Sequence, residues 1–173
     1  DHHPERHLGF VRPAGALDSR ADSKALSGAI DDAVTNRVWR LELASPGRPH
    51  DVTAGSSFSG VAVARSGGAK PAAVAIRQSF SEPPTLVRLD LGSGNAGALS
   101  TFNDAPLAAI RQGKVESVTY LGARNAEIQM WVVYPPDFDP AKTYPLVLEI
   151  HGGPHAMYGE NFRFEPQRLA ANG

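Results

Sequence analysis

The alternation of apolar and polar side chains predicts short β-strands along the first two thirds of the chain. Residues 39–43, Trp-Arg-Leu-Glu-Leu, and residues 87–91, Val-Arg-Leu-Asp-Leu, follow one pattern, 48 positions apart when their central leucines, 41 and 89, are compared. Between them, β-prone runs at 58–65 and 72–78 flank the glycine-containing turn 66–70. Each period of the pattern therefore holds about four short strands.

A repeat of this length with about four strands per unit predicts blades of a β-propeller, in which each small sheet buries its faces against neighbouring sheets. On the repeat alone, a β-sandwich with two similar hairpins is an equal alternative. A propeller needs at least about four blades. We therefore expect residues 1–112 to be the C-terminal blades of a ring that continues upstream.

The hydrophobic pattern changes downstream of the repeat. Residues 114–120 and 127–134 alternate as a β-hairpin, which the pair Pro135-Pro136 ends. Residues 146–150, Leu-Val-Leu-Glu-Ile, form an apolar run that predicts a strand covered on both faces. Residues 162–172 have helical spacing and end before a glycine. This order places the glycine loop after 150 at the carboxyl end of a sheet strand, where open α/β sheets bind ligands.

Composition and charge exclude several function classes. The formal net charge is -1 and the pI is about 6.7, so no basic surface for nucleic acid or an anionic membrane is expected. The absence of cysteine excludes disulfides and thiolate metal sites. No run approaches the roughly 18 apolar residues that span a bilayer. We expect a soluble protein, and the sequence leaves open whether its compartment is cytoplasmic or periplasmic.

The two ends of the chain suggest a piece of a longer protein. The sequence opens on Asp1 rather than methionine, and it stops at Gly173 directly after the predicted helix. We therefore expect a fragment, and an isolated fragment is expected to expose strand edges and associate.

The pair Gly152-Gly153 is the strongest candidate for chemistry. Acyl transfer places negative charge on an oxygen in its transition state, and a fixed backbone N–H directed at that oxygen stabilises it. Glycine amides have no Cβ to obstruct the approach, while Pro154 stiffens the exit of the loop. The loop predicts hydrolytic chemistry that needs neither a metal nor another cofactor.

The motif around these glycines resembles a known family. The sequence His-Gly-Gly-Pro-His at 151–155, preceded by Pro-Pro-Asp-Phe-Asp-Pro at 135–140 and by Tyr144-Pro145, is similar to the opening of the α/β-hydrolase domain of the prolyl oligopeptidase family of serine peptidases. The likeness is strongest to acylaminoacyl-peptidase-like and bacterial dipeptidyl-peptidase-like members, which carry a β-propeller directly before that domain. Residues 78–103 are similar to the last blade of that propeller.

The resemblance covers about residues 37–173 and implies a fold and an activity. Residues 1–112 would be C-terminal propeller blades and 113–173 the N-terminal part of an α/β-hydrolase domain. The Gly153 amide would supply half of the oxyanion hole, with Gly152 shaping the turn. The nucleophilic serine of the family lies in a Gly-x-Ser-x-Gly elbow, which is absent here, so the whole triad is expected downstream.

The resemblance also implies substrates and partners. It implies hydrolysis of short peptides through an acyl-enzyme, with the isolated chain inactive. The expected partners are the peptide substrate and the rest of the same polypeptide, upstream and downstream. The sequence leaves homo-oligomerisation open.

The polar residues near the loop have two interpretations each. His151 either contacts the oxyanion or hydrogen-bonds nearby backbone, and we favour the supporting role. His155 and Tyr158 either line the substrate pocket or cover the loop, and the sequence does not decide between these. Glu149 is expected to hydrogen-bond within its sheet.

Polar residues elsewhere are interpreted as structural. His2, His3 and His7 are expected to form a polar tail rather than a metal site, because no second cluster completes a tetrahedral ligand set. Arg40 and Arg88 occupy equivalent positions of the repeat, which favours packing or pairing between blades over substrate binding.

Two other functions are compatible with the pattern. In a non-enzymatic β-rich binding module, His-Gly-Gly-Pro would be only a tight turn after an edge strand. The apolar character of 146–150 on both faces favours the enzyme, because an edge strand would carry charges. An esterase of the α/β-hydrolase class is the second alternative, against which the blade-like repeat argues.

Overall fold

A computed structural model describes residues 18–19, 24–32, 34–44, 47–64, 71–153 and 156–173. The N-terminal histidines, the turn 66–70 and His155 lie outside the described residues. The chain divides into two compact units, Asp1–Thr101 with Met157–Asn161, and Phe102–Ala156 with Phe162–Gly173. Each unit is described by itself below.

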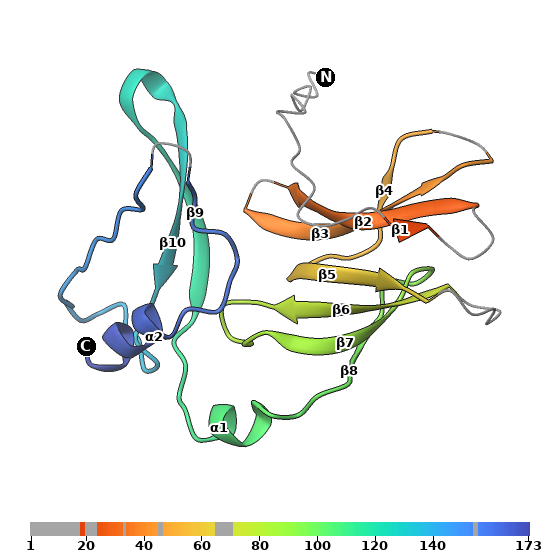
Figure 1. The fold of residues 1–173 in the computed structure, drawn as a ribbon. Coiled ribbons are helices and arrows are strands. Elements are labelled where there is room, and N and C mark those ends of the chain that lie inside the picture. The colour runs from red at the N-terminus through yellow and green to blue at the C-terminus, as the bar shows by residue number, and fades with distance from the viewer. Residues whose placement is uncertain (1–17, 20–23, 33, 45–46, 65–70, 154–155) are drawn as a thin grey trace. The chain divides into compact units, whose positions relative to one another are not determined.

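The first unit contains two four-stranded antiparallel sheets (Figure 1). In both sheets the strands follow one another in chain order, so each strand pairs with the next one in the sequence. The first sheet consists of β1 (Asp18–Ser19), β2 (Ala25–Asp32), β3 (Thr35–Glu42) and β4 (His50–Asp51). The second consists of β5 (Ser57–Val63), β6 (Ala72–Gln78), β7 (Thr85–Asp90) and β8 (Ala96–Ala98).

The sequence repeat corresponds to the third strand of each sheet, β3 and β7. The two strands bury opposite faces. Val38 and Arg40 are buried in β3, whereas Val87 and Leu89 are buried in β7, and Arg88 points to solvent. Opposite faces are expected when one sheet stacks on the next, because the lower face of one unit meets the upper face of its neighbour.

The core of the first unit joins its two sheets. Val38 of β3 belongs to one buried cluster with seven side chains of the second sheet and its turn, namely Phe58, Val63, Ala73, Ala75, Val87, Leu89 and Leu91. Burying one such Val, Leu or Phe side chain stabilises the fold by about 1.5–3 kcal/mol. The stacked sheets therefore hold each other through side chains that neither could bury alone.

Arg40 adds a polar link between the two sheets. Its Nη1 donates to the carbonyl oxygen of Leu91 at 3.4 Å, and its Nη2 lies 2.5 Å from Oε1 of Glu42. The residue is only 8% exposed. A contact between the two sheets is thus observed for Arg40, whereas Arg88 is exposed.

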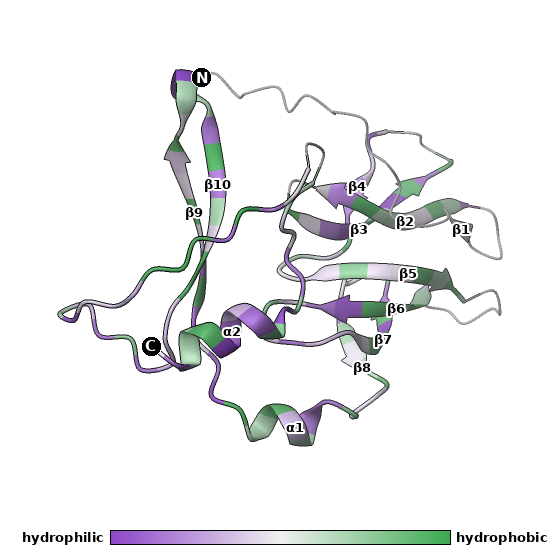
Figure 2. Cartoon of the chain, turned by 60° about the vertical axis from the view of Figure 1, so that its left-hand side comes forward, coloured by the Kyte–Doolittle hydropathy of each residue, from purple (hydrophilic) through white to green (hydrophobic). Residues whose placement is uncertain are grey.

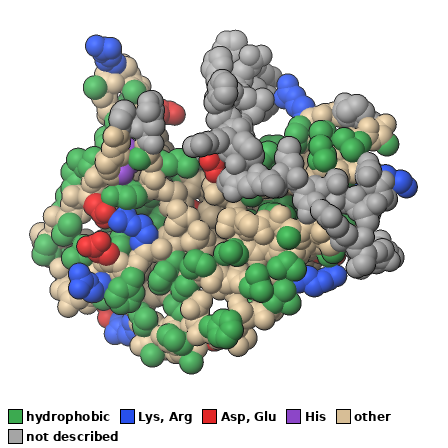
Figure 3. All heavy atoms as spheres, viewed as in Figure 1, with side chains coloured by type: hydrophobic (Ala, Val, Ile, Leu, Met, Phe, Trp, Pro, Cys, Tyr) green, Lys and Arg blue, Asp and Glu red, His purple; other side chains and the backbone are tan. Residues whose placement is uncertain are grey.

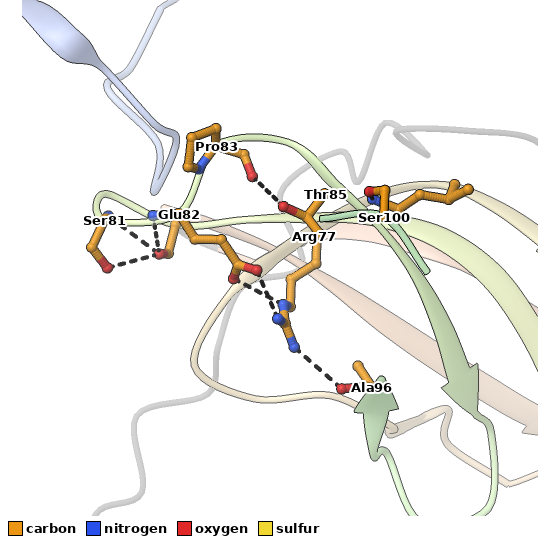
Figure 4. Close-up of polar contacts among 9 residues, drawn as sticks. Arg77, Ser81, Glu82, Pro83, Thr85, Ala96 and Ser100 are labelled. Atoms are coloured by element: carbon orange, nitrogen blue, oxygen red, sulfur yellow. Dashed lines mark hydrogen bonds and ion pairs between the residues drawn. The ribbon is translucent and has the colours of Figure 1, made fainter. Parts of the chain in front are cut away.

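An ion pair closes the turn between β6 and β7 (Figure 4). Nε and Nη2 of Arg77 donate to the two carboxylate oxygens of Glu82 at 2.9 and 2.7 Å. Nη1 of Arg77 also donates to the carbonyl oxygen of Ala96 at 3.3 Å. Two-point contact between a guanidinium and a carboxylate fixes the geometry more strongly than a single bond, so this turn is tied to β8 as well.

The second unit is built on the predicted hairpin. β9 (Val115–Leu121) pairs antiparallel with β10 (Glu127–Val133), and the 3₁₀ turn η1 (Ala123–Asn125) connects them. Arg124 and Asn125 of this turn both have φ of 58°, the left-handed region that hairpin turns require. The unit also holds α1 (Asp104–Ala108) and α2 (Phe164–Ala171). In Figure 2, hydrophobic and hydrophilic positions share α2 and alternate along β10.

Helix α2 confirms the helix predicted at 162–172. It begins two residues later, at Phe164, and ends one residue earlier, at Ala171. Gly173 follows its last turn with φ of 94°, the left-handed conformation expected after a helix, and its N–H donates to the Ala170 carbonyl oxygen at 3.4 Å. Among the described residues, no helix is both long and apolar enough to cross a membrane.

The prediction of a covered strand at 146–150 is wrong for this structure. These residues form no strand, and Leu146, Leu148 and Ile150 are 90, 74 and 78% exposed. A central strand exists only when neighbouring strands satisfy its backbone groups, and none of the described residues pairs with this segment. Part of an α/β-hydrolase sheet is therefore not evident here, and the described structure is mostly β-sheet.

Candidate active site

The glycine loop follows the extended coil 146–150 and is open to solvent. His151, Gly152 and Gly153 are all exposed. A Cβ built on Gly152 would meet no atom within 4 Å. The described residues therefore do not require glycine at 152 for space.

The His151 ring contacts the backbone of the glycine loop. Its Nδ1 lies 2.8 Å from the carbonyl oxygen of Gly152. Because a carbonyl oxygen can only accept, Nδ1 carries the proton in this contact.

Glu149 contacts the start of α2 instead of a sheet neighbour. Its Oε1 accepts a hydrogen bond from Nη2 of Arg163 at 2.6 Å. The expectation that Glu149 bonds within a sheet is wrong, because the segment around it is not a strand. The ion pair joins the chain before the glycine loop to the residue that precedes α2, so it restrains both ends of this stretch.

Tyr158 and the glycine loop belong to different units of the chain, and His155 lies outside the described residues. Tyr158 belongs to Met157–Asn161, which packs in the first unit, whereas residues 151–153 belong to the second. The Glu160 N–H donates to the Val34 carbonyl oxygen at 2.7 Å and fixes the 157–161 segment against the turn between β2 and β3. Burial raises the pKa of the Glu160 carboxyl, and the charge of Arg37 partly opposes this rise.

A polar cluster that the sequence analysis did not single out lies at the base of the hairpin. Glu116 contacts the ammonium of Lys114 through Oε1, and its Oε2 accepts from the Tyr134 hydroxyl at 2.9 Å. Both hydrogen bonds stabilise the carboxylate, so they lower the pKa of Glu116, the one to Lys114 most. The bond to Glu116 raises the pKa of Lys114 and is the largest cause of the raised pKa of Tyr134.

The cluster borders a pocket with a volume of about 310 Å³. Pro135, Pro136 and Phe138 complete its lining, and the rings of Tyr134 and Phe138 are 4.6 Å apart at 49°. The alternation of 114, 116 and 118 on one strand face was the available signal for this cluster. The charges of Lys114 and Glu116 pair with each other. The bond from Tyr134 to Glu116 joins the residue after β10 to β9, so the cluster fixes this end of the hairpin.

No group of three or more His, Cys, Asp or Glu side chains in the described part of the chain is arranged to hold a metal ion.

Comparison with known proteins gives partial but clear matches. No family model matches the chain. The dipeptidyl-peptidase 5 of Porphyromonas endodontalis is 36% identical over 103 residues, which are 58% of this chain and 15% of that protein. The chain matches part of the length of prolyl oligopeptidase family members. This finding confirms the resemblance drawn from the motif at 135–155.

Solved structures of the same family share the fold. An acylaminoacyl peptidase in complex with Z-Gly-Gly-Phe-chloromethyl ketone matches with a TM-score of 0.73 at 15% identity, over 96% of this chain and 24% of that one. The acylaminoacyl peptidase of Pyrococcus horikoshii matches with a TM-score of 0.70 at 16% identity, over 92% and 23%. The chain thus spans about a quarter or less of the length of these relatives.

Proposed function

We propose that this chain is a section of a serine peptidase that hydrolyses short peptides through an acyl-enzyme, and that residues 151–153 supply part of its oxyanion hole. The observation that carries the proposal is the exposure of the glycine loop 151–153, which lies open to solvent. The similarity to a dipeptidyl-peptidase over 103 residues supports the reaction class.

In this proposal the Gly153 N–H donates to the oxygen of the tetrahedral intermediate. The useful distance from such a donor to the oxyanion is about 2.7–3.1 Å. A second donor would come from the residue after the nucleophilic serine. His151 holds the loop through its bond to the Gly152 carbonyl, so the amide needs little reorganisation when charge develops.

The apolar segment 146–150 supports the assignment to a hydrolase domain. Four of its five side chains are large hydrophobics that are at least 65% exposed, and leaving so much apolar surface in water is unfavourable. We propose that it becomes a central strand when further strands pair with it, with 1–112 as propeller blades and 113–173 as the start of the hydrolase domain.

The segment 146–150 is not a covered strand here, so it does not argue against a non-enzymatic binding module. The peptidase relatives now argue against it instead. An esterase of the same hydrolase class gains no support from the structure, whose two stacked four-stranded sheets match peptidases.

The test uses the complete protein encoded around this chain. Purified protein is assayed with acylated amino-acid amides, dipeptidyl amides and simple esters, and is separately labelled with a fluorophosphonate that reacts with activated serines. We expect amide hydrolysis and stoichiometric labelling, with an initial burst of released amine if the acyl-enzyme accumulates. Ester hydrolysis without amide hydrolysis, or no labelling, would overturn the proposal.

A further inference from the structure

A second, apolar groove lies within the second unit, apart from the glycine loop. It is bordered by the end of α1 with the residues after it, and by α2 with the residue pair before it. Its volume is about 160 Å³. Its apolar lining consists of Leu107, Ile110, Phe162, Phe164 and Ala171. Figure 3 shows hydrophobic side chains gathered over α1 on the face in view.

One wall of the groove is held in a fixed position. Gln167 lines it and is buried, while its side-chain amide makes two hydrogen bonds with the backbone of Gly113, at 2.7 and 3.2 Å. These bonds satisfy the polar end of Gln167, so its methylene groups can face the groove without an unmet polar group. The groove is therefore preformed on this side.

Two arginines border the groove and differ in their pairing. Arg111 contacts the carboxylate of Asp137. No ion pair or side-chain hydrogen bond involves the guanidinium of Arg168 among the residues that the structure describes. An exposed arginine beside an apolar groove is suited to the two-point binding of a carboxylate.

The size of the groove limits its occupant. An engineered protein cavity of about 150 Å³, lined by Leu, Ile and Phe, takes up benzene. A groove of about 160 Å³ with the same residue types accepts one aromatic ring or one branched aliphatic group. Apolar lining with a few placed polar groups is the usual composition of small-molecule sites.

We propose that this groove binds a small organic carboxylate that carries one aromatic or branched aliphatic group. The apolar group lies between α1 and α2, and the carboxylate accepts hydrogen bonds from Arg168. The site depends neither on the glycine loop nor on peptidase activity, so it stands or fails separately from the function proposed above.

The probe is 3-phenylpropionate, titrated into the whole chain while the amide resonances of Ile110 and Ala171 are followed by NMR. We expect saturable shifts with a dissociation constant on the order of 1 mM, as for a ligand of roughly ten non-hydrogen atoms. The neutral analogue 3-phenylpropanol should bind about tenfold more weakly, because it lacks the charge-assisted bonds. N-acetyl-phenylalanine distinguishes two sources of the same chemistry: equal or tighter binding supports a peptide C-terminus, and weaker binding supports a free carboxylate.

Variants separate recognition from folding. Arg168→Gln should weaken 3-phenylpropionate about tenfold, and Arg168→Lys should keep most of the affinity. Arg88→Gln, on the exposed face of β7, removes the same charge elsewhere and should change nothing. Equal affinity for the neutral analogue, unchanged binding by Arg168→Gln in a folded variant, or the absence of saturable shifts would overturn the proposal.

Discussion

The side-chain amide of Gln167 binds both backbone hydrogen-bonding groups of Gly113. The Gly113 N–H donates to Oε1 at 2.7 Å, and Nε2 donates to the Gly113 carbonyl oxygen at 3.2 Å. The side chain thus acts as a one-residue strand partner from 54 positions away. Gly113 must lack a side chain, since a Cβ there would lie 1.8 Å from the Tyr134 carbonyl oxygen. This contact fixes α2 against the start of the hairpin.

Gln167→Leu should destabilise the chain because it leaves the buried N–H and C=O of Gly113 without partners. We expect the free energy of unfolding to fall by about 2–4 kcal/mol, since each unmet buried group costs about 1–3 kcal/mol and water can reach part of the site. Urea denaturation measures the change. Gln129→Leu, which removes an exposed hydrogen bond to Ser117, should cost less than about 0.5 kcal/mol; similar losses for both variants would contradict the role of Gln167.

Arg40 and Arg88 are a matched pair because they occupy equivalent positions of the repeat. Arg40→Ala removes the buried contacts to Leu91 and Glu42 and leaves space between the sheets, so the free energy of unfolding should fall by about 1–3 kcal/mol. Arg88→Ala should change it by less than about 0.5 kcal/mol, because that side chain is exposed. Equal effects in thermal unfolding would show that Arg40 does not join the sheets.

Gly153→Val tests the oxyanion assignment in the complete protein. If the amide donates to the oxyanion, the bulkier residue should lower kcat by about a hundredfold or more and leave KM nearly unchanged, because the interaction forms only in the transition state. Steady-state kinetics on a peptide amide separate the two constants. Gly97→Val is the control, since Gly97 lies in the edge strand β8 with open space at its Cβ position. Wild-type kcat in Gly153→Val would remove the assignment.

The half-buried Glu160 predicts a pH dependence of stability. Burial raises its pKa above the ordinary value of 4.5, so the folded state holds the proton more tightly than the unfolded chain. Its contribution is full below pH 4.5 and is lost as pH rises through the raised pKa. Glu160→Gln should remove this loss when urea unfolding is compared across a pH series. Glu165→Gln replaces an exposed carboxyl of α2 and should leave the wild-type dependence of stability on pH unchanged.

The sequence predicted the features that depend on neighbouring residues. Alternation and turn residues predicted the hairpin β9–β10, and the 48-residue repeat predicted the equivalence of β3 and β7. The opposite burial of Arg40 and Arg88 was not predicted, because it depends on which face of each strand meets a second sheet. The motif at 135–155 indicated the family that the comparisons match, yet its local pattern could not indicate that Glu149 pairs with Arg163.

The conformation of the apolar segment 146–150 could not be predicted from its local sequence pattern. Its residue types fit a covered strand, but strand formation needs hydrogen-bond partners that lie far away in sequence. Similarly, the two bonds between Gln167 and Gly113 join positions that no local periodicity connects.

The opposite burial of equivalent strands makes the contact between the two sheets directional. The two faces of a sheet differ in composition, and unlike faces meet where the two sheets contact each other. An uncovered face therefore cannot be covered by a copy of itself. Head-to-tail interfaces of this kind form a closed ring when the last unit contacts the first, and otherwise form an open-ended array. A sheet that covered the side of β3 bearing Trp39 would therefore need a surface of different composition, and a substitution that made this side complementary to itself would favour closed pairs of molecules.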